Sequence, residues 1–349
     1  MTKLYDDILQ IRNFERTNEK MKSLKLVVVG VGHVGSYVLA DAMKLGLFGE
    51  IGVIDLDNRV AHGEALDQSH ATALPYMTNI DVTSGGYKQC EDADIIICAA
   101  GSSILRDPDN PEAMPDRTLL TKRSAGVIRE VMTGITKYTK SAIIIFITNP
   151  LDTMVYIAEN EFGYPSGKIF GTGTMLDSAR LRKTVANLYH IDPKSVTGYM
   201  MGEHGLTAFP VLSKLNVAGI GYKELASYYP DIEQLTAEEI SKEVVKTAYD
   251  VLNAKGWTNA GVAQAAVTMA KCIALDERSV YPACSTLRGE YGHDGDVAFS
   301  MPCLIGKDGI IRRIAPKLDD WETEKLNESI DYIHNAMKEA KTGPEFLEK

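Results

Sequence analysis

The sequence has few cysteines, and their spacing favours neither a metal cluster nor a disulfide framework. Only five cysteines occur in 349 residues, an odd number without any C-x-x-C pair. Structural zinc sites and disulfide-stapled domains need closer or paired cysteines. We therefore expect free thiols in a reducing cytoplasm. The five residues are Cys90, Cys98, Cys272, Cys284 and Cys303.

Long hydrophobic runs are also missing. The apolar run at 142–147 has the length of a strand and is far shorter than a membrane-spanning helix. The first ten residues include Asp6 and Asp7 and hold no apolar core segment, which argues against a signal peptide. These absences predict a soluble, cytoplasmic protein without a membrane partner.

Positive charge is in deficit. The chain has 37 Lys and Arg residues against 47 Asp and Glu residues, a net charge of −10. Binding to nucleic acid or to an anionic membrane requires a basic face, so neither partner is expected. A small anionic substrate remains compatible, because the local charge of a site can oppose the net charge of the protein.

The order of the hydrophobic segments predicts an α/β fold with two domains. From Leu24 onward, short β-branched runs alternate with helical segments, which is typical of a doubly wound parallel sheet. In such sheets, ligands bind at the carboxyl ends of the strands. Strands are expected at 26–29, 51–54, 94–99 and 142–148, and helices at 36–47 and 117–138.

The second half is less regular and predicts a mixed α+β domain. Helices are expected at 174–189, from Thr236 towards Asn253 and from about Asp319; strands are expected before His204 and at 282–288 and 298–305. We thus expect an N-terminal extension at 1–23, a Rossmann-type domain at 24–172 and a catalytic domain at 173–345. The extension is either a subunit-packing arm or a loosely ordered tail.

A glycine motif follows the first strand and predicts a dinucleotide site. The motif spans Gly30, Gly32, Val34 and Gly35, and Asp55 ends the next strand about 20 residues later. The glycines permit a tight turn, close approach of a pyrophosphate and close packing of the helix. Asp55 would accept hydrogen bonds from ribose hydroxyls and repel a 2′-phosphate, which favours NAD over NADP. The alternative is a tight turn beside a surface aspartate.

A second constellation predicts proton transfer on a small anion. His204 lies in a Gly-Glu-His-Gly stretch, and Asp177 and Arg180 lie close together in an earlier helical segment. A histidine held by a carboxylate can act as an acid or base, and an arginine can bind a carboxylate through two parallel hydrogen bonds. Taken singly, the histidine could be a turn residue, and Asp177 and Arg180 could form an i,i+3 pair on a solvated helix.

With these motifs in order, the chain resembles the L-lactate/malate dehydrogenase superfamily, and within it most closely the L-2-hydroxyisocaproate dehydrogenases. The similarity runs from Leu24 to about Ala340. The matching segments are 30–35, Asp55, 63–67, 116–117, 148–150, 171–180, 202–205 and 255–258.

The resemblance implies an NAD-dependent oxidoreductase that reversibly transfers hydride between NADH and a small 2-keto acid. In its terms, His204 is the acid/base, Asp177 orients its imidazole, and Arg117 polarises the substrate carbonyl. Arg180 binds the substrate carboxylate. No metal site is expected, because the other six histidines show no metal-ligand spacing.

The resemblance also assigns residues around the substrate and the cofactor. Asn149 matches a residue near both substrate and cofactor, and its bond to Pro150 is a candidate cis peptide. Thr258 matches a substrate-side residue, and Gly101 ends a strand on the cofactor side. Relatives of this kind are homotetramers or homodimers, which we expect here. Arg117, considered alone, could simply begin a helix.

Substrate choice is expected to depend on segment 102–116, a proline-containing loop that precedes Arg117. Arg106 is its only candidate for a second substrate-binding cation, and acidic Asp107 and Asp109 beside it disfavour a dicarboxylate. The segment therefore favours a branched or bulky aliphatic 2-keto acid, with lactate second and malate third. The alternative for Arg106 is a solvated lid residue without a role in substrate binding. A non-catalytic NAD-binding structural protein is the alternative from another functional class.

Overall fold

The computed structural model describes residues 23–102 and 117–347. Predictions for the N-terminal extension up to residue 22, and for the loop that contains Arg106, lie outside the described residues. Arg117 is the first residue of a helix, and its side chain also lies outside the description.

A nine-stranded sheet forms the centre of the described structure. Its order is β14-β13-β12-β6-β5-β4-β1-β2-β3. The six strands from β3 to β6 are parallel, and β12, β13 and β14 continue the sheet in antiparallel fashion. The strands are β1 (Leu24–Val29), β2 (Phe48–Ile54), β3 (Asp81–Ser84), β4 (Ile95–Cys98), β5 (Ile143–Phe146), β6 (Ile169–Gly171), β12 (Ser279–Arg288), β13 (Asp294–Gly306) and β14 (Gly309–Arg313). The predicted doubly wound α/β fold is confirmed.

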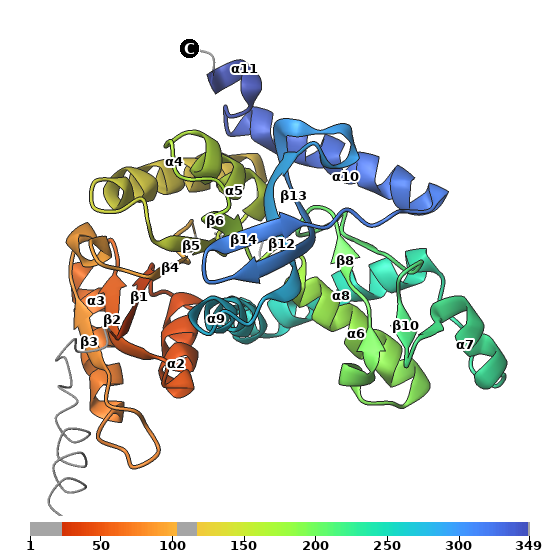
Figure 1. The fold of residues 1–349 in the computed structure, drawn as a ribbon, viewed down its shortest axis with the longest axis horizontal. Coiled ribbons are helices and arrows are strands. Elements are labelled where there is room, and N and C mark those ends of the chain that lie inside the picture. The colour runs from red at the N-terminus through yellow and green to blue at the C-terminus, as the bar shows by residue number, and fades with distance from the viewer. Residues whose placement is uncertain (1–22, 103–116, 348–349) are drawn as a thin grey trace, which may run out of the picture.

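The central strands are apolar along their whole length because helices cover both faces of the sheet. β4 and β5 read Ile-Ile-Ile-Cys and Ile-Ile-Ile-Phe, and every one of these residues is buried. Continuous β-branched runs are typical of parallel strands covered on both sides. In Figure 1, α4 and α5 lie on one side of the strands and α2 and α9 on the other. The helices are α2 (Gly35–Leu45), α3 (Asn58–Ala71), α4 (Arg117–Thr136), α5 (Leu151–Asn160) and α9 (Ala260–Ala274).

The sheet runs without interruption from the first half of the chain into the second. β6 pairs with β12 through Gly171 and Cys284, and Gly202 forms an isolated antiparallel bridge with Ser300 of β13. Strands from both halves therefore share one hydrogen-bonded layer, and the loop that carries His204 is attached to it.

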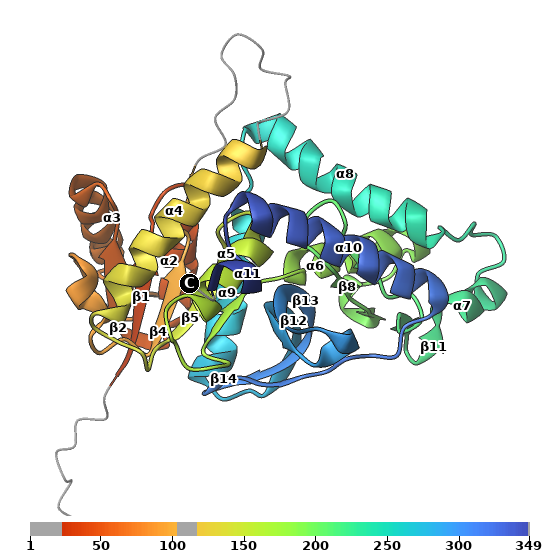
Figure 2. The same cartoon turned by 90° about the horizontal axis from the view of Figure 1, so that it is seen from above.

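The second half adds helices and two small sheets around its own hydrophobic core. The remaining elements are α6 (Met175–Tyr189), β7 (Val196–Thr197), β8 (Met200–Met201), β9 (Phe209–Pro210), β10 (Asn216–Val217), β11 (Ile220–Gly221), α7 (Tyr222–Tyr228), α8 (Ala237–Lys255), α10 (Asp320–Glu339), α11 (Pro344–Leu347) and the short 3-10 turns η1 (Tyr87–Cys90), η2 (Pro193–Ser195) and η3 (Glu290–Gly292). Figure 2 shows α10 crossing towards α4 and α5.

Two details of the second half bear on the sequence predictions. The helix expected from Thr236 is present as α8, and Thr236 and Glu239 form a capping box at its start. The strand expected to end at His204 is wrong in extent: β8 has only two residues, because Gly202 turns the chain at a φ of 109°.

The five cysteines are free, as their spacing predicted, and the structure shows that all of them are buried. Among the described residues, no helix is long and apolar enough to cross a membrane.

The glycine loop yields a prediction about stability. A Cβ on Gly35 would lie 1.8 Å from the carbonyl oxygen of Gly30, whereas a Cβ on Gly32 would meet no atom within 4 Å. Gly35→Ala should therefore lower the free energy of unfolding by about 2 kcal/mol or more through overpacking. Gly32→Ala, the matched control, should change it little. Urea denaturation of both variants measures this, and equal stability of the two would contradict the packing argument.

Candidate active site

The glycine loop between β1 and α2 leaves hydrogen-bond donors for an anion. Gly30 adopts a φ of 85°, and its N–H donates to the carbonyl of Ile54 at 2.7 Å. A Cβ at Gly30 would lie 2.6 Å from the backbone of Ala100, so only glycine fits this turn. Val34, the N-cap of α2, makes no side-chain capping bond. The positive end of the α2 dipole, with the open space above Gly32, fits a pyrophosphate.

Asp55 ties the end of β2 to this loop. One carboxylate oxygen accepts the N–H of Val31 at 2.9 Å, and the other accepts the N–H of Asp57 at 3.0 Å. Each carboxylate oxygen has two lone pairs, so acceptor capacity remains for ribose hydroxyls. Asp55 is half-buried, and its predicted role as the ribose-binding residue stays a prediction.

Gly101 and Asn149 lie at the ends of neighbouring strands. Both are exposed, and Thr148 fills the space between the strand ends, donating to the carbonyl of Ala100 at 2.5 Å. A Cβ on Gly101 would lie 2.5 Å from the methyl group of Thr148. The Asn149–Pro150 peptide bond is cis, as predicted.

The turn between α8 and α9 brings the second half against the glycine loop. The ring of Trp257 stacks on His33 with centroids 4.0 Å apart, and Asn259 donates to the carbonyl of His33 at 3.3 Å. Thr258 is half-buried between these two contact residues. The structure thus places Thr258 beside the cofactor loop, although no side-chain hydrogen bond of Thr258 is observed here.

His204, Asp177 and Arg180 form one connected cluster. Nδ1 of His204 lies 2.7 Å from Oδ2 of Asp177, and Arg180 donates from Nη1 to Oδ1 of Asp177 at 3.0 Å. Asp177 and Arg180 can meet because they lie three residues apart on one side of α6. The second carboxylate oxygen of Asp177 is left for His204. The exposed fraction of the side chain is 18% for His204, 6% for Asp177 and 14% for Arg180. The contact between Asp177 and Arg180 is therefore not a solvated surface pair.

The electrostatics of the cluster favour a charged imidazole. Burial alone would lower the pKa of His204, but the charge and hydrogen bond of Asp177, together with Asp152 and Glu203, raise it to about 9. For Asp177, burial pushes the pKa upward, and His204 and Arg180 outweigh this and hold it below its usual value. The pair therefore forms an imidazolium–carboxylate at neutral pH, ready to give a proton.

Sequence analysis missed two buried carboxylates beside His204. Asp152 accepts the backbone N–H of His204 at 2.8 Å, and it lies in α5, three residues after Asn149. Glu203 is 7% exposed and accepts two hydrogen bonds from Thr207. The position of Asp152 in the first turn after a strand end was the available signal, since such positions face the site in parallel sheets.

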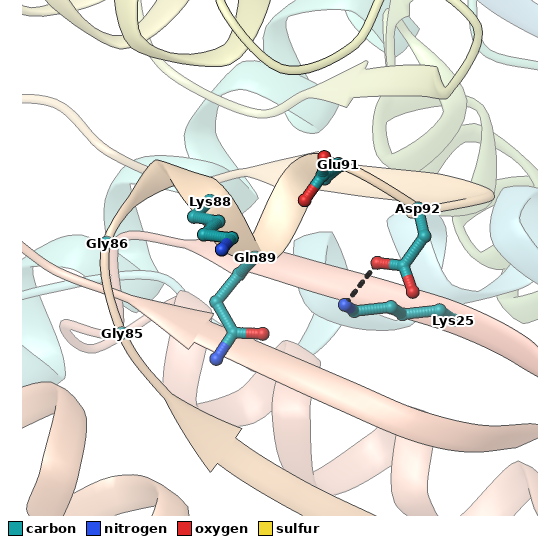
Figure 3. Close-up of a pocket in the computed structure, with 7 residues that line it drawn as sticks. All are labelled: Lys25, Gly85, Gly86, Lys88, Gln89, Glu91 and Asp92. Atoms are coloured by element: carbon teal, nitrogen blue, oxygen red, sulfur yellow. Dashed lines mark hydrogen bonds and ion pairs between the residues drawn. The ribbon is translucent and has the colours of Figure 1, made fainter.

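A surface hollow elsewhere on the molecule is unsuited to this chemistry. Figure 3 shows it at the beginning of β1, where Lys25 pairs with Asp92. Gly30 and the cofactor loop follow the carboxyl end of the same strand, where ligands bind in such sheets. The hollow lies at the amino end. The hollow, of about 570 Å³, is lined by Lys25, Gly85, Gly86, Lys88, Gln89, Glu91 and Asp92.

The arrangement can bind a dinucleotide, hold a carboxylate and exchange a proton. Arg180 uses one donor nitrogen for Asp177 and keeps further guanidinium N–H groups for a second carboxylate. Within the described residues, no group of three or more His, Cys, Asp or Glu side chains is arranged to hold a metal ion.

Known proteins with similar sequences are dehydrogenases. The chain is 43% identical to L-lactate dehydrogenase 2 of Clostridium acetobutylicum over 314 residues, which covers 90% of this chain and 96% of that protein. It is 42% identical to an L-lactate dehydrogenase of Selenomonas ruminantium, with 90% and 96% covered. Both relatives are named L-lactate dehydrogenases. The expected closer resemblance to L-2-hydroxyisocaproate dehydrogenases therefore stays a prediction.

Solved structures agree with the fold. The chain superposes on a minor L-lactate dehydrogenase from Enterococcus mundtii with a TM-score of 0.83 at 29% identity, covering 90% of this chain and 98% of that one. The lactate/malate dehydrogenase NAD-binding domain matches residues 24–171, and the α/β C-terminal domain of the same family matches residues 174–343. The chain therefore belongs to the lactate/malate dehydrogenase family and is an NAD-dependent oxidoreductase of 2-hydroxy acids.

Proposed function

We propose that this NAD-dependent dehydrogenase interconverts pyruvate and L-lactate. The observation that carries the proposal is the buried His204–Asp177–Arg180 cluster in a chain whose 42–43% identical relatives are named L-lactate dehydrogenases. A 2-keto acid needs one anion-binding group and one proton donor, and the cluster supplies both.

The proposed roles of the residues follow from their charge and contacts. Arg180 binds the carboxylate of the keto acid, which orients its carbonyl. His204, protonated through its contact with Asp177, gives a proton to the carbonyl oxygen and takes it back in the reverse reaction. Bound NAD supplies or accepts the hydride. We assign Arg117 to polarising the carbonyl, and Asn149 and Thr258 to the substrate, on the resemblance to the family.

On the cofactor side, we propose that the loop from Gly30 to Gly35 holds the pyrophosphate. The N-terminus of α2 after Val34 and the space above Gly32 support this proposal. Asp55 is proposed to accept the ribose hydroxyls, and Gly101 to border the cofactor. The proposed assembly is a homotetramer or homodimer, as in the family.

A branched or bulky aliphatic 2-keto acid is the second candidate substrate, and oxaloacetate the third. The second candidate is favoured by apolar Ile104, Leu105 and Met114 in the loop before Arg117. That loop, including Arg106, lies outside the described residues. The intact proton-transfer cluster argues against the non-catalytic alternative.

A comparison of three substrates tests the proposal. Rates of NADH oxidation with pyruvate, 2-ketoisocaproate and oxaloacetate should give the highest kcat/KM for pyruvate. A clear preference for 2-ketoisocaproate would replace lactate by a bulky hydroxy acid, and a preference for oxaloacetate would assign a substrate role to Arg106. Absence of turnover with all three would refute the dehydrogenase assignment.

Replacing His204 should stop proton transfer without removing the cofactor site. His204→Asn is expected to lower kcat by about 10³-fold, the usual worth of a positioned acid/base, while NADH binds with unchanged affinity. NADH fluorescence and steady-state kinetics measure the two quantities. Turnover close to that of the wild-type protein would rule out His204 as the acid/base.

The pH dependence should follow the raised pKa of His204. Reduction of the keto acid needs the protonated imidazole, so its kcat/KM should hold at neutral pH and fall as the pH rises through about 9. Oxidation of the hydroxy acid needs the neutral imidazole and should rise over the same range. Initial rates in both directions measure this, and a reduction limb near pH 6.5 would contradict the influence of Asp177.

Arg180 should affect the substrate more than the cofactor. Arg180→Leu is expected to raise KM for pyruvate by about 10²-fold, equivalent to about 3 kcal/mol for a lost charge-paired contact. Arg180→Lys keeps the charge but loses the planar fork, so its KM should lie between those of wild type and Arg180→Leu. Steady-state kinetics of the three proteins measure this. An unchanged KM in Arg180→Leu would exclude the anchoring role.

A further inference from the structure

The loop that carries the catalytic histidine has little stiffness of its own. Gly202 precedes Glu203 and His204 with a φ of 109°, and Gly205 follows them. Glycine loses more backbone freedom on folding than any other residue, so a segment between two glycines needs external contacts to hold one conformation. Two hydrogen bonds, one buried and one partly buried, provide such contacts. The N–H of Glu203 donates to Oγ of Ser329 at 2.6 Å, and the N–H of His204 donates to Asp152.

The carboxylate of Asp152 collects donors from three separate segments. It is 2% exposed, and Oδ2 accepts the His204 N–H at 2.8 Å. Oδ1 accepts the hydroxyl of Ser300 from β13 at 3.3 Å, and the thiol of Cys284 from β12 also bonds to the side chain. A buried ionised carboxylate requires such donors, because its charge has lost the solvation of water.

Charged groups face His204 from every element packed against it. Asp177 and Arg180 come from α6, Asp152 from α5, and Glu203 from the loop itself. Burial raises the pKa of Asp152, and the hydrogen bonds from Cys284 and His204 oppose that rise. Among these groups, only Asp152 combines a negative charge with a direct bond to the backbone of His204.

We propose that Asp152 is a positioning residue for the dehydrogenase reaction: it fixes the backbone of His204 and places a negative charge near the imidazole. This inference rests on the proposed function. The substrate carboxylate is held independently by Arg180, so the placement of His204 affects the rate of proton transfer more than substrate affinity.

Two substitutions separate the hydrogen bond to His204 from the negative charge of Asp152. Asp152→Ala removes both. In Asp152→Asn, the amide oxygen can still accept the His204 N–H, and the hydroxyl of Ser300 can turn to accept from the amide nitrogen. Ser300→Ala is the matched control, because it removes another partner of Asp152 but leaves the bond to His204. All variants are full-length proteins, tested with pyruvate and NADH and checked by thermal unfolding and NADH fluorescence.

In Asp152→Ala, kcat should fall about 10²-fold, the usual effect of a small misplacement of a catalytic group, with KM for pyruvate and NADH affinity changed less than about twofold. Asp152→Asn should recover most of kcat at neutral pH, and its alkaline limb for reduction should lie at lower pH than in wild type, since one negative charge near the imidazolium is gone. Ser300→Ala should resemble wild type.

Three results would overturn the inference: full kcat in Asp152→Ala, an alkaline limb in Asp152→Asn that coincides with that of wild type, or a loss in Ser300→Ala equal to that in Asp152→Ala. If Asp152→Ala does not fold, the pH profile of Asp152→Asn decides alone. A wild-type protein that turns over none of the three keto acids would instead refute the proposed function.

Discussion

The active site depends on one buried arrangement of charge, in which His204 contacts carboxylates from both halves of the chain. Asp177 lies on α6 of the second half and Asp152 on α5 of the first half. Moving an imidazolium out of water is costly, and these carboxylates compensate for that cost. The same contacts that keep the proton on His204 therefore also hold the two halves together at the place where cofactor and substrate must meet.

The continuous sheet provides the rigid frame for this contact. Because β6 pairs with β12, and Gly202 bridges to Ser300, the loop of His204 is attached to the layer that also carries the glycine loop. The stacking of Trp257 on His33 adds a second connection between the halves. Elements of regular structure hold side chains more precisely than long loops do, which suits a reaction that needs accurate alignment.

The fold and the contact between Asp177 and Arg180 could be predicted because their signals are local. Continuous β-branched runs such as Ile95–Cys98 identify buried parallel strands, and the glycine motif with Asp55 has a fixed place after the first strands. The spacing of Asp177 and Arg180 places both on one helical face, and the structure shows them in contact.

The remaining features depend on contacts between segments distant in sequence. For Asp152, the sequence signals a place at the site, in the first turn after a strand, but not its partner. The extension of the parallel sheet by β12, β13 and β14 is set by packing between the halves. Asp152 is separated from His204 by 52 residues, and no periodicity or motif connects a carboxylate with a backbone N–H so far away. The end of the strand before His204 was placed too late for a related reason: Gly202 turns the chain where it pairs with Ser300.

The burial of all five thiols has a consequence for how the protein meets oxidising conditions. Sulfur is attacked by peroxide or alkylating reagents as an accessible thiolate, and burial raises the pKa of Cys90, Cys98 and Cys303 to about 12 and that of Cys284 well above its usual value. Cys284 lies directly against Asp152, the residue that anchors the histidine loop. Oxidation of that sulfur therefore requires the sheet to open, so attack on these thiols would affect catalysis only after local unfolding.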